Sequence, residues 1–98
     1  MATTVDFDAA ARVEFDNAFD WYAQRSPGAA LGFASEVDAA IDLIAAAPER
    51  FPETNAGCRS CALHRYPYRV IYYRSQDRLI VVAIAHARRR PGFRRDRV

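Results

Sequence analysis

The stretch YRVIYYRSQDRLIVVAIAH, residues 68–86, decides the fold of this chain. Its second half contains the longest apolar run in the sequence, Leu79 to Ala85, which is far shorter than the roughly 20 residues that a membrane-spanning helix needs. A near-continuous run of this length is typical of a central strand covered on both faces, and we predict that strand over residues 78–86. Residues 68–74 are rich in Val, Ile and Tyr and predict a neighbouring strand, with Ser75-Gln76-Asp77 as the hairpin turn.

Two amphipathic helices are predicted before these strands. In residues 9–25, apolar side chains recur at helical spacing after Asp8, a suitable N-cap. A second and more regular helical pattern follows Ser26-Pro27, where the serine can cap the helix and the proline suits its first turn. This pattern ends at Ala47-Pro48, because the residue before a proline avoids the helical region. Together the two segments predict a helical hairpin.

The remaining segments complete the order β-α-α-β-β-β. Residues 3–7 predict a short first strand, residues 49–57 a loop, and residues 59–65 the strand before Tyr66-Pro67. We therefore predict an α+β fold: a single domain over residues 1–98 in which the helical hairpin packs on one face of a small, mainly antiparallel sheet. Residues 88–98 form a basic C-terminal tail. The other face of the sheet is expected to carry Arg59, Arg65, Arg69, His86 and this tail.

Charge is unevenly distributed along the chain. Residues 1–53 contain ten acids and three arginines, a net charge of −7, whereas residues 54–98 contain eleven arginines and two acids, a net charge of +9. All 14 basic residues are arginine. This asymmetry indicates a binding face for phosphate or carboxylate on the second half of the chain. Attraction between acidic helices and a basic sheet within the domain explains part of the same pattern.

Composition favours a small soluble protein of the cytoplasm. Residues 1–6 lack the basic start and apolar run of a signal peptide, and no apolar segment is long enough to span a bilayer. Two cysteines provide no disulfide framework, so a reducing compartment is expected. A chain of 98 residues buries a thin core, and a permanent partner could contribute to its stability.

The spacing Cys58-x-x-Cys61-x-x-His64, with His86 elsewhere, invites a comparison with zinc sites. Structural zinc needs four convergent ligands, but residues three apart in an extended strand point to opposite faces. A redox Cys-x-x-Cys pair normally opens a helix, whereas this pair lies before or within a strand. We therefore predict neither a metal nor another cofactor.

His86 is the main candidate for acid–base chemistry. It ends the predicted central strand just before Arg88-Arg89-Arg90, at the rim of a basic surface, and histidine can act as a general acid or base near neutral pH. Ser60 and Ser75 lie in no nucleophile-elbow context. A hydrogen-bonded structural histidine at a strand end is the favoured interpretation of His86, with a general acid or base as the alternative.

Arginine and tyrosine are mixed in the predicted sheet, as in residues 65–74. Arginine pairs with phosphate and tyrosine stacks on bases, but the same surface would suit an acidic protein segment, and these tyrosines also fit strand and core positions. The candidate residues for binding a target or a protein partner are Arg59, Arg65, Arg88, Arg89, Arg90, Phe93, Arg94 and Arg95.

Four strings in order along the chain resemble the RelE/ParE superfamily of toxins from bacterial type II toxin–antitoxin systems. They are Trp21-Tyr22 with Arg25-x-Pro27, then Pro48-x-x-Phe51-Pro52, then residues 65–72, and finally residues 83–93. The resemblance spans nearly the whole chain. It implies a small growth-arresting toxin whose basic surface is occupied by a cognate antitoxin. The two proteins would form a hetero-oligomer that does not bind a membrane.

The superfamily divides by target. One branch is similar to RelE, a ribosome-dependent mRNA endoribonuclease, and this resemblance would make His86 the acid or base and place Arg69 and Arg89 on the phosphate. Phe93 falls where that branch often has a tyrosine, and the lysines that several members use are absent. Arginine does not replace lysine as a base, because it stays protonated in proteins.

The second branch is similar to ParE and its plasmid-stabilisation relatives, which poison DNA gyrase through protein contact and have no catalytic residues. The string from His86 to Gly92 looks more like this branch. We therefore favour a non-enzymatic gyrase inhibitor. An mRNA endoribonuclease and an inactive relative that only binds its antitoxin are the alternatives.

Overall fold

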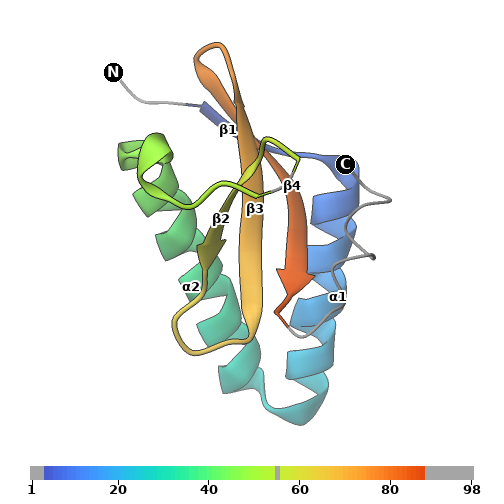
Figure 1. Cartoon of the computed structure of the whole chain (residues 1–98). Coiled ribbons are helices and arrows are strands. Elements are labelled where there is room, and N and C mark those ends of the chain that lie inside the picture. Colours follow the sequence, from blue (N-terminus) through green and yellow to red (C-terminus); the bar gives the residue numbers. More distant parts are fainter. Residues whose placement is uncertain (1–3, 55, 88–98) are drawn as a thin grey trace.

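The computed structural model describes residues 4–54 and 56–87, and these form two helices on a four-stranded sheet (Figure 1). The strand order is β1-β4-β3-β2, with β1 parallel to β4 and the other neighbours antiparallel. This confirms the predicted α+β class and the order of elements. The elements are β1 (Thr4–Phe7), α1 (Ala9–Arg25), α2 (Pro27–Ala46), a short 3₁₀ helix η1 (Pro48–Arg50), β2 (Arg59–Ala62), β3 (Tyr68–Ser75) and β4 (Arg78–His86).

The helical hairpin is defined by its caps. Asp8 accepts a hydrogen bond from the Ala10 N–H at 3.3 Å and begins α1. Ser26 lies between the helices in extended backbone, ends α1 by donating its N–H to the Tyr22 carbonyl, and caps α2 through its side chain. Pro27 then occupies the first turn of α2. One residue therefore separates the two helices, as the sequence predicted. No helix of the described segments is long and apolar enough to cross a membrane.

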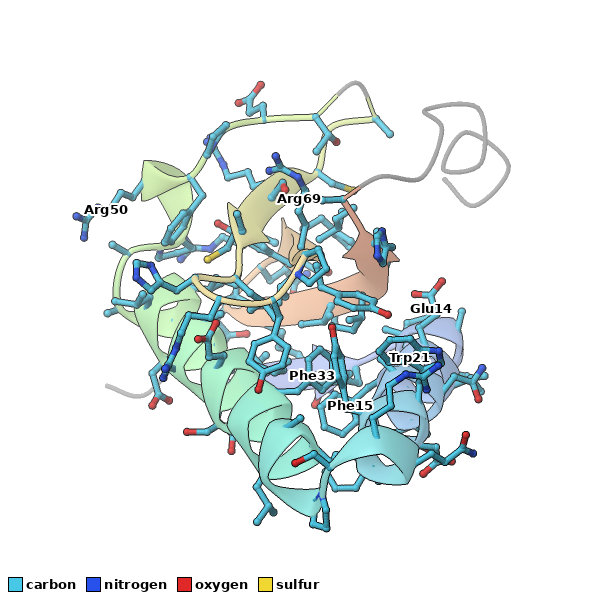
Figure 2. The ribbon with its side chains drawn as sticks, turned by 90° about the horizontal axis from the view of Figure 1, so that it is seen from below. Glu14, Phe15, Trp21, Phe33, Arg50 and Arg69 are labelled. Carbon is cyan, nitrogen blue, oxygen red and sulfur yellow. The ribbon has the colours of Figure 1, made fainter. Side chains whose placement is uncertain are left out.

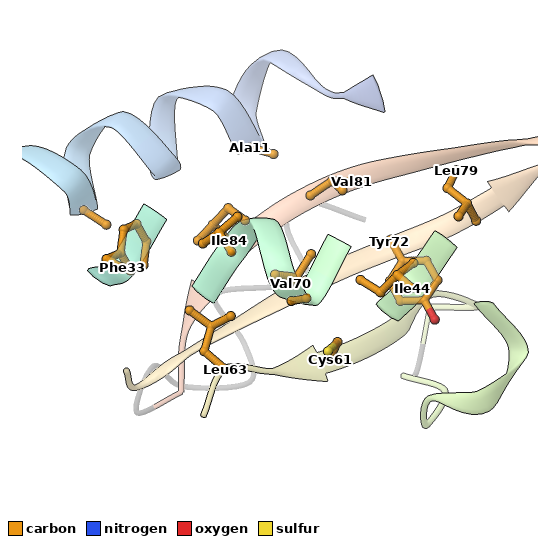
Figure 3. Close-up of a cluster of buried hydrophobic side chains, with 13 residues drawn as sticks. Ala11, Phe33, Ile44, Cys61, Leu63, Val70, Tyr72, Leu79, Val81 and Ile84 are labelled. Carbon is orange, nitrogen blue, oxygen red and sulfur yellow. The ribbon is translucent and has the colours of Figure 1, made fainter. Parts of the chain in front are cut away.

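The main core lies between the helices and the sheet (Figure 3). Phe33 and Ile44 of α2 are fully buried there against the inward side chains of β3 and β4. A second, smaller cluster lies on the other side of the sheet and consists of Cys58, Ile71, Ala83 and Ala85. Strand β4 is thus covered on both faces, which confirms the interpretation of its apolar run.

A β-bulge changes the direction of the side chains along β4. Ile71 lies opposite Ala83, but Tyr72 lies opposite Val81, so Val82 is an extra residue in the ladder. Val81, before the bulge, points toward the helices, and Ile84, after the bulge, points toward them as well. The bulge therefore moves every later residue of β4 to the face opposite to the one that regular alternation would give.

Strand β2 is shorter than predicted, because it ends at Ala62 rather than at residue 65. The chain turns there toward α2, where the Glu36 carboxylate accepts hydrogen bonds from the backbone N–H groups of His64 and Arg65 at 2.8 and 3.0 Å. Those backbone groups therefore bind a side chain instead of a neighbouring strand. The predicted loop 49–57 also contains η1 and a β-bridge between Glu53 and Arg59.

Tyr66 fixes the same turn to α2. Its hydroxyl donates to the Ala29 carbonyl at 2.8 Å, and a side chain at Gly32 would place its Cβ 2.5 Å from that hydroxyl oxygen. Gly32 is needed here for close approach rather than for an unusual backbone angle. Through Glu36 and Tyr66, α2 holds residues 63–67 in one place.

Candidate functional site

A groove in the described part of the chain lies between α1 and the C-terminal half of β4. Its volume is about 790 Å³. Figure 2 shows Glu14 and Trp21 of α1 on the flank of that helix that borders this groove. The lining residues are Ala10, Val13, Glu14, Asn17, Ala18, Trp21 and Tyr22 from α1, with Pro67, Tyr68, Ile84, Ala85 and His86 from the sheet.

The α1 wall of the groove carries exposed apolar side chains. Val13 is 55% exposed and Trp21 is 49% exposed, and Asn17 lies between them at a spacing of four residues. Residues at this spacing share one face of a helix. The Arg25 guanidinium lies 3.5 Å from the centre of a Trp21 ring and also donates to the Trp21 carbonyl at 3.1 Å. Apolar surface with a cation at one end is a feature of partner-binding sites more than of solvated helix faces.

The opposite wall of the groove is an edge of β4. Strand β1 pairs only with residues 78–81, so no strand in the described chain pairs with this edge from Val82 to His86. The Ile84 N–H points away from β3 and donates to the Glu14 Oε1 at 2.8 Å. A helix side chain thus binds a backbone group that would bind a strand in a complete sheet.

His86 lies in this groove, on the helix side of the sheet. It is opposite Tyr68 in the ladder, and the two rings meet edge to face with 5.0 Å between their centres. Tyr68 in turn packs on Phe33 of the core at 5.3 Å. The expectation that His86 lies on the open face was therefore wrong, and the bulge at Val82 is the reason.

Arg69 does lie on the face away from the helices, as Figure 2 shows. It is opposite Ala85, and its guanidinium donates to the Ser60 hydroxyl at 3.4 Å. Because Arg69 and His86 lie on opposite faces of the sheet, the structure does not bring together these two members of the predicted nuclease site. Arg89, the third member, lies outside the described residues.

Arg59 and Arg65 also differ from the expectation of a basic open face. Arg59 is opposite Tyr72 on the helix side, donates to the Phe51 carbonyl at 2.7 Å and pairs with Glu53 at 3.1 Å. Arg65 lies in the turn after β2 and pairs with Glu36 at 3.3 Å. The other predicted binding residues, Arg88, Arg89, Arg90, Phe93, Arg94 and Arg95, lie outside the described residues.

Internal ion pairs account for most of the described positive charge in the second half of the chain. Besides Arg59 and Arg65, Arg74 pairs with Glu49 at 3.3 Å and Arg78 pairs with Asp6. All four acids come from residues 1–53. The acidic and basic halves of the sequence therefore attract each other within the domain, and Arg69 is left as the described arginine of the second half without such an ion pair.

The two cysteines point to opposite faces of the sheet. Cys61 belongs to the main core and Cys58 to the smaller outer cluster, as their spacing predicted. Burial raises the pKa of both thiols. A raised pKa disfavours the thiolate that zinc binding and disulfide exchange require. This geometry gives the pair no shared site.

Sequence reasoning missed the contributions of α1 to the groove. No role in binding was assigned from the sequence to Val13, Glu14 or Trp21. A signal was present, because Val13 and Trp21 are apolar residues on a helix face that is otherwise polar. The backbone edge of β4 has no counterpart in the sequence, because it depends on where β1 ends.

Comparisons with known proteins give one family match and a structural match for the fold. Residues 5–91 match the model of the family described as ParE toxin of the type II toxin–antitoxin system, parDE. Among solved structures, a chain of the chromosomal ParDE toxin–antitoxin system from P. aeruginosa superimposes with a TM-score of 0.75, at 16% sequence identity, over 86% of this chain and 95% of that one. No curated protein sequence matches significantly.

Proposed function

The chain belongs to the ParE toxin family of type II toxin–antitoxin systems, and from that premise we propose that it arrests growth by inhibiting DNA gyrase through protein contact. The observation that supports contact rather than catalysis is the placement of Arg69 and His86 on opposite faces of the sheet. A general acid or base must reach the same substrate atoms as the groups that stabilise its charge. One phosphodiester could not contact both side chains through the sheet.

The residues proposed to contact the target are basic. They are Arg69 on the outer face of the sheet and the arginines at 88–90, 94 and 95, which follow β4 in the sequence and lie outside the described residues. The described arginines 59, 65, 74 and 78 are already paired with acids of the same chain, so they contribute less to this surface than the sequence indicated. A gyrase surface rich in carboxylates is the expected complement.

The proposed antitoxin site is the groove between α1 and β4. It combines exposed Val13 and Trp21 with a sheet edge that no strand of the described chain covers. A partner seated there would bury apolar surface, which is the main favourable term in most protein association. Toxin and antitoxin would then form a hetero-oligomer in the cytoplasm, where gyrase also acts.

A cleavage assay tests the proposed target. The purified chain is mixed with gyrase, supercoiled plasmid and ATP, and linear DNA is measured after detergent and protease treatment. We expect linear DNA to accumulate, to persist with His86→Ala, and to disappear when Arg88, Arg89 and Arg90 are all changed to Ala. Preincubation with the antitoxin encoded beside the toxin should suppress it.

Other outcomes would refute gyrase inhibition. A folded wild-type chain that gives no linear DNA but cuts mRNA on ribosomes would be an endoribonuclease, and loss of that cutting in His86→Ala or Arg69→Ala would confirm it. A folded chain that does neither, and causes no growth arrest on induction, would be an inactive relative that only binds its antitoxin.

A further inference from the structure

The last residue that the structure describes is bound to a turn and not to a strand. His86 is opposite Tyr68 in the ladder, and beyond it the Ala87 N–H donates to the Pro67 carbonyl at 2.7 Å. Pro67 belongs to the turn of residues 63–67 between β2 and β3. The position of Ala87, after which the basic tail of the sequence begins, therefore depends on the position of this turn.

This turn is bound to α2 (Figure 1). The Glu36 carboxylate accepts the backbone N–H groups of His64 and Arg65 at 2.8 and 3.0 Å, and the side chain of Glu36 is only 15% exposed. The Tyr66 hydroxyl donates to the Ala29 carbonyl at 2.8 Å. Three successive residues of the turn are therefore held by one helix.

Gly32 marks how closely the turn approaches α2. A Cβ at this position would lie 2.5 Å from the Tyr66 hydroxyl oxygen. A Cβ at Gly28, in the first turn of the same helix, would lie 3.7 Å from the Ser26 Oγ, which is an ordinary contact. Glycine inside a helix is unfavourable relative to alanine. Gly32 therefore has a packing role that Gly28 does not share.

We propose that α2, through this turn, positions the start of the basic tail for contact with the target. Gly32, Glu36 and Tyr66 are then positioning residues, which act through Pro67 and Ala87 and do not touch the target themselves. The proposal rests on the proposed function, in which arginines of the tail contact gyrase. A segment whose starting point is held in one place loses less freedom on binding, so it binds more tightly.

The distance from α2 to Ala87 tests the geometry directly. Nitroxide labels are attached at Asp38→Cys, an exposed position of α2, and at Ala87→Cys, and the distance between them is measured by pulsed electron paramagnetic resonance. Cys58 and Cys61 are 3% and 4% exposed, so the labels react with the introduced residues. We expect one narrow distance with Gly32 in place. In Gly32→Ala we expect a second, shifted population, because the added Cβ displaces the turn.

Unlabelled variants test the effect on gyrase through the linear DNA of the cleavage assay. Gly32→Ala should need at least about 10-fold more toxin for the same amount of linear DNA. Tyr66→Phe loses one hydrogen bond and should need about 2- to 5-fold more. The double variant should match Tyr66→Phe, since without the hydroxyl the nearest atom of that ring would lie 3.5 Å from the added Cβ. Gly28→Ala, the control glycine in the same helix, should leave both the distance and the linear DNA unchanged.

The results separate this proposal from gyrase inhibition itself. A shifted distance in Gly32→Ala with undiminished linear DNA would refute the positioning role, and so would a loss of linear DNA at an unchanged distance, which would make the turn itself a contact of the target. A folded double variant as impaired as Gly32→Ala would show that the loss does not come from the clash with Tyr66, and would also refute it. A wild-type chain that gives no linear DNA would overturn gyrase inhibition, while an unchanged distance in Gly32→Ala would separately overturn the role of α2 in fixing Ala87.

Discussion

The two halves of β4 are both mainly apolar, but their surroundings differ. Residues 78–81 lie between β1 and β3, and Leu79 and Val81 are fully buried. Residues 82–86 have β3 on one side and a groove crossed by Glu14 on the other. An apolar run therefore predicts that a strand will be covered, but the length of its neighbours determines what covers it. The half that the fold leaves incomplete is the half available to a partner.

The largest effect on stability is expected in residues 78–81, the half of β4 that lies between β1 and β3 and is here called the sealed half. Leu79→Ala removes a fully buried side chain and should cost about 2–5 kcal/mol of unfolding free energy, because it leaves a cavity in a thin core. The matched change in the open half, Val82→Ala, should cost less than half as much, since Val82 is only partly buried at the bulge. Urea denaturation of both variants measures the contrast. Equal losses would contradict the division of β4 into two halves.

Trp21→Ala should separate binding from folding. Its side chain is half exposed in the groove, so stability should change little, but antitoxin affinity should fall about 10- to 100-fold if Trp21 anchors the partner. Isothermal titration with the antitoxin measures the affinity. Leu31→Ala, which changes a 66% exposed residue of α2 away from the groove, serves as the control and should bind normally.

Glu36 makes the stability of the turn after β2 depend on pH. Burial opposes ionisation of its carboxyl, but hydrogen bonds from the Arg65 and His64 backbones and from the Arg65 side chain outweigh it and lower the pKa. A group with a lowered folded-state pKa stabilises the fold above its unfolded value, near 4.5 here, and that contribution is lost as pH falls through the folded value.

Glu36→Gln should therefore cost about 1–3 kcal/mol at neutral pH, because two backbone donors lose a charged acceptor. The difference in Tm between the variant and the wild type should shrink as the pH is lowered from 7 to 3. A difference that stays constant over this range would show that the charge of Glu36 does not stabilise the turn.

The smallest effect is expected at the exposed end of the sealed half, where Asp6 pairs with Arg78. Asp6→Asn should lower the Tm by less than Glu36→Gln does, because exposed ion pairs contribute little. Adding about 1 M salt should remove the difference, since the Debye length is then roughly 3 Å. A larger loss than that of Glu36→Gln would mean that this pair holds β1 against β4.

The sequence was sufficient to predict the helices and strands, but not the face of the sheet on which each side chain lies. Caps at Asp8 and Ser26 and the apolar run of β4 are local signals, and the structure follows them. The side of the sheet on which His86 lies depends on the bulge at Val82, which nothing in the Val81-Val82 dipeptide marks. Leu79 points toward the helices, and regular alternation along β4 from this residue would have placed His86 on the open face with Arg69.

The predicted surface positions of the arginines were wrong for a different reason. The acids that pair with Arg65, Arg74 and Arg78 lie 25 or more residues away in the sequence, and long-range pairing follows from the tertiary fold rather than from local pattern. The groove was missed because Glu14 contacts a backbone group, and a backbone edge carries no sequence signature. Local chemistry is readable from the sequence, whereas the contacts that define this site join distant segments.

The parallel pairing of β1 with β4 has a consequence for the order of events during synthesis. Thr4 lies opposite Arg78, a separation of 74 residues, so β1 has no partner until β4, the last strand of the described chain, has left the ribosome. Pairing across such a separation is slow relative to local structure. A nascent toxin therefore passes through a stage with helices but an incomplete sheet.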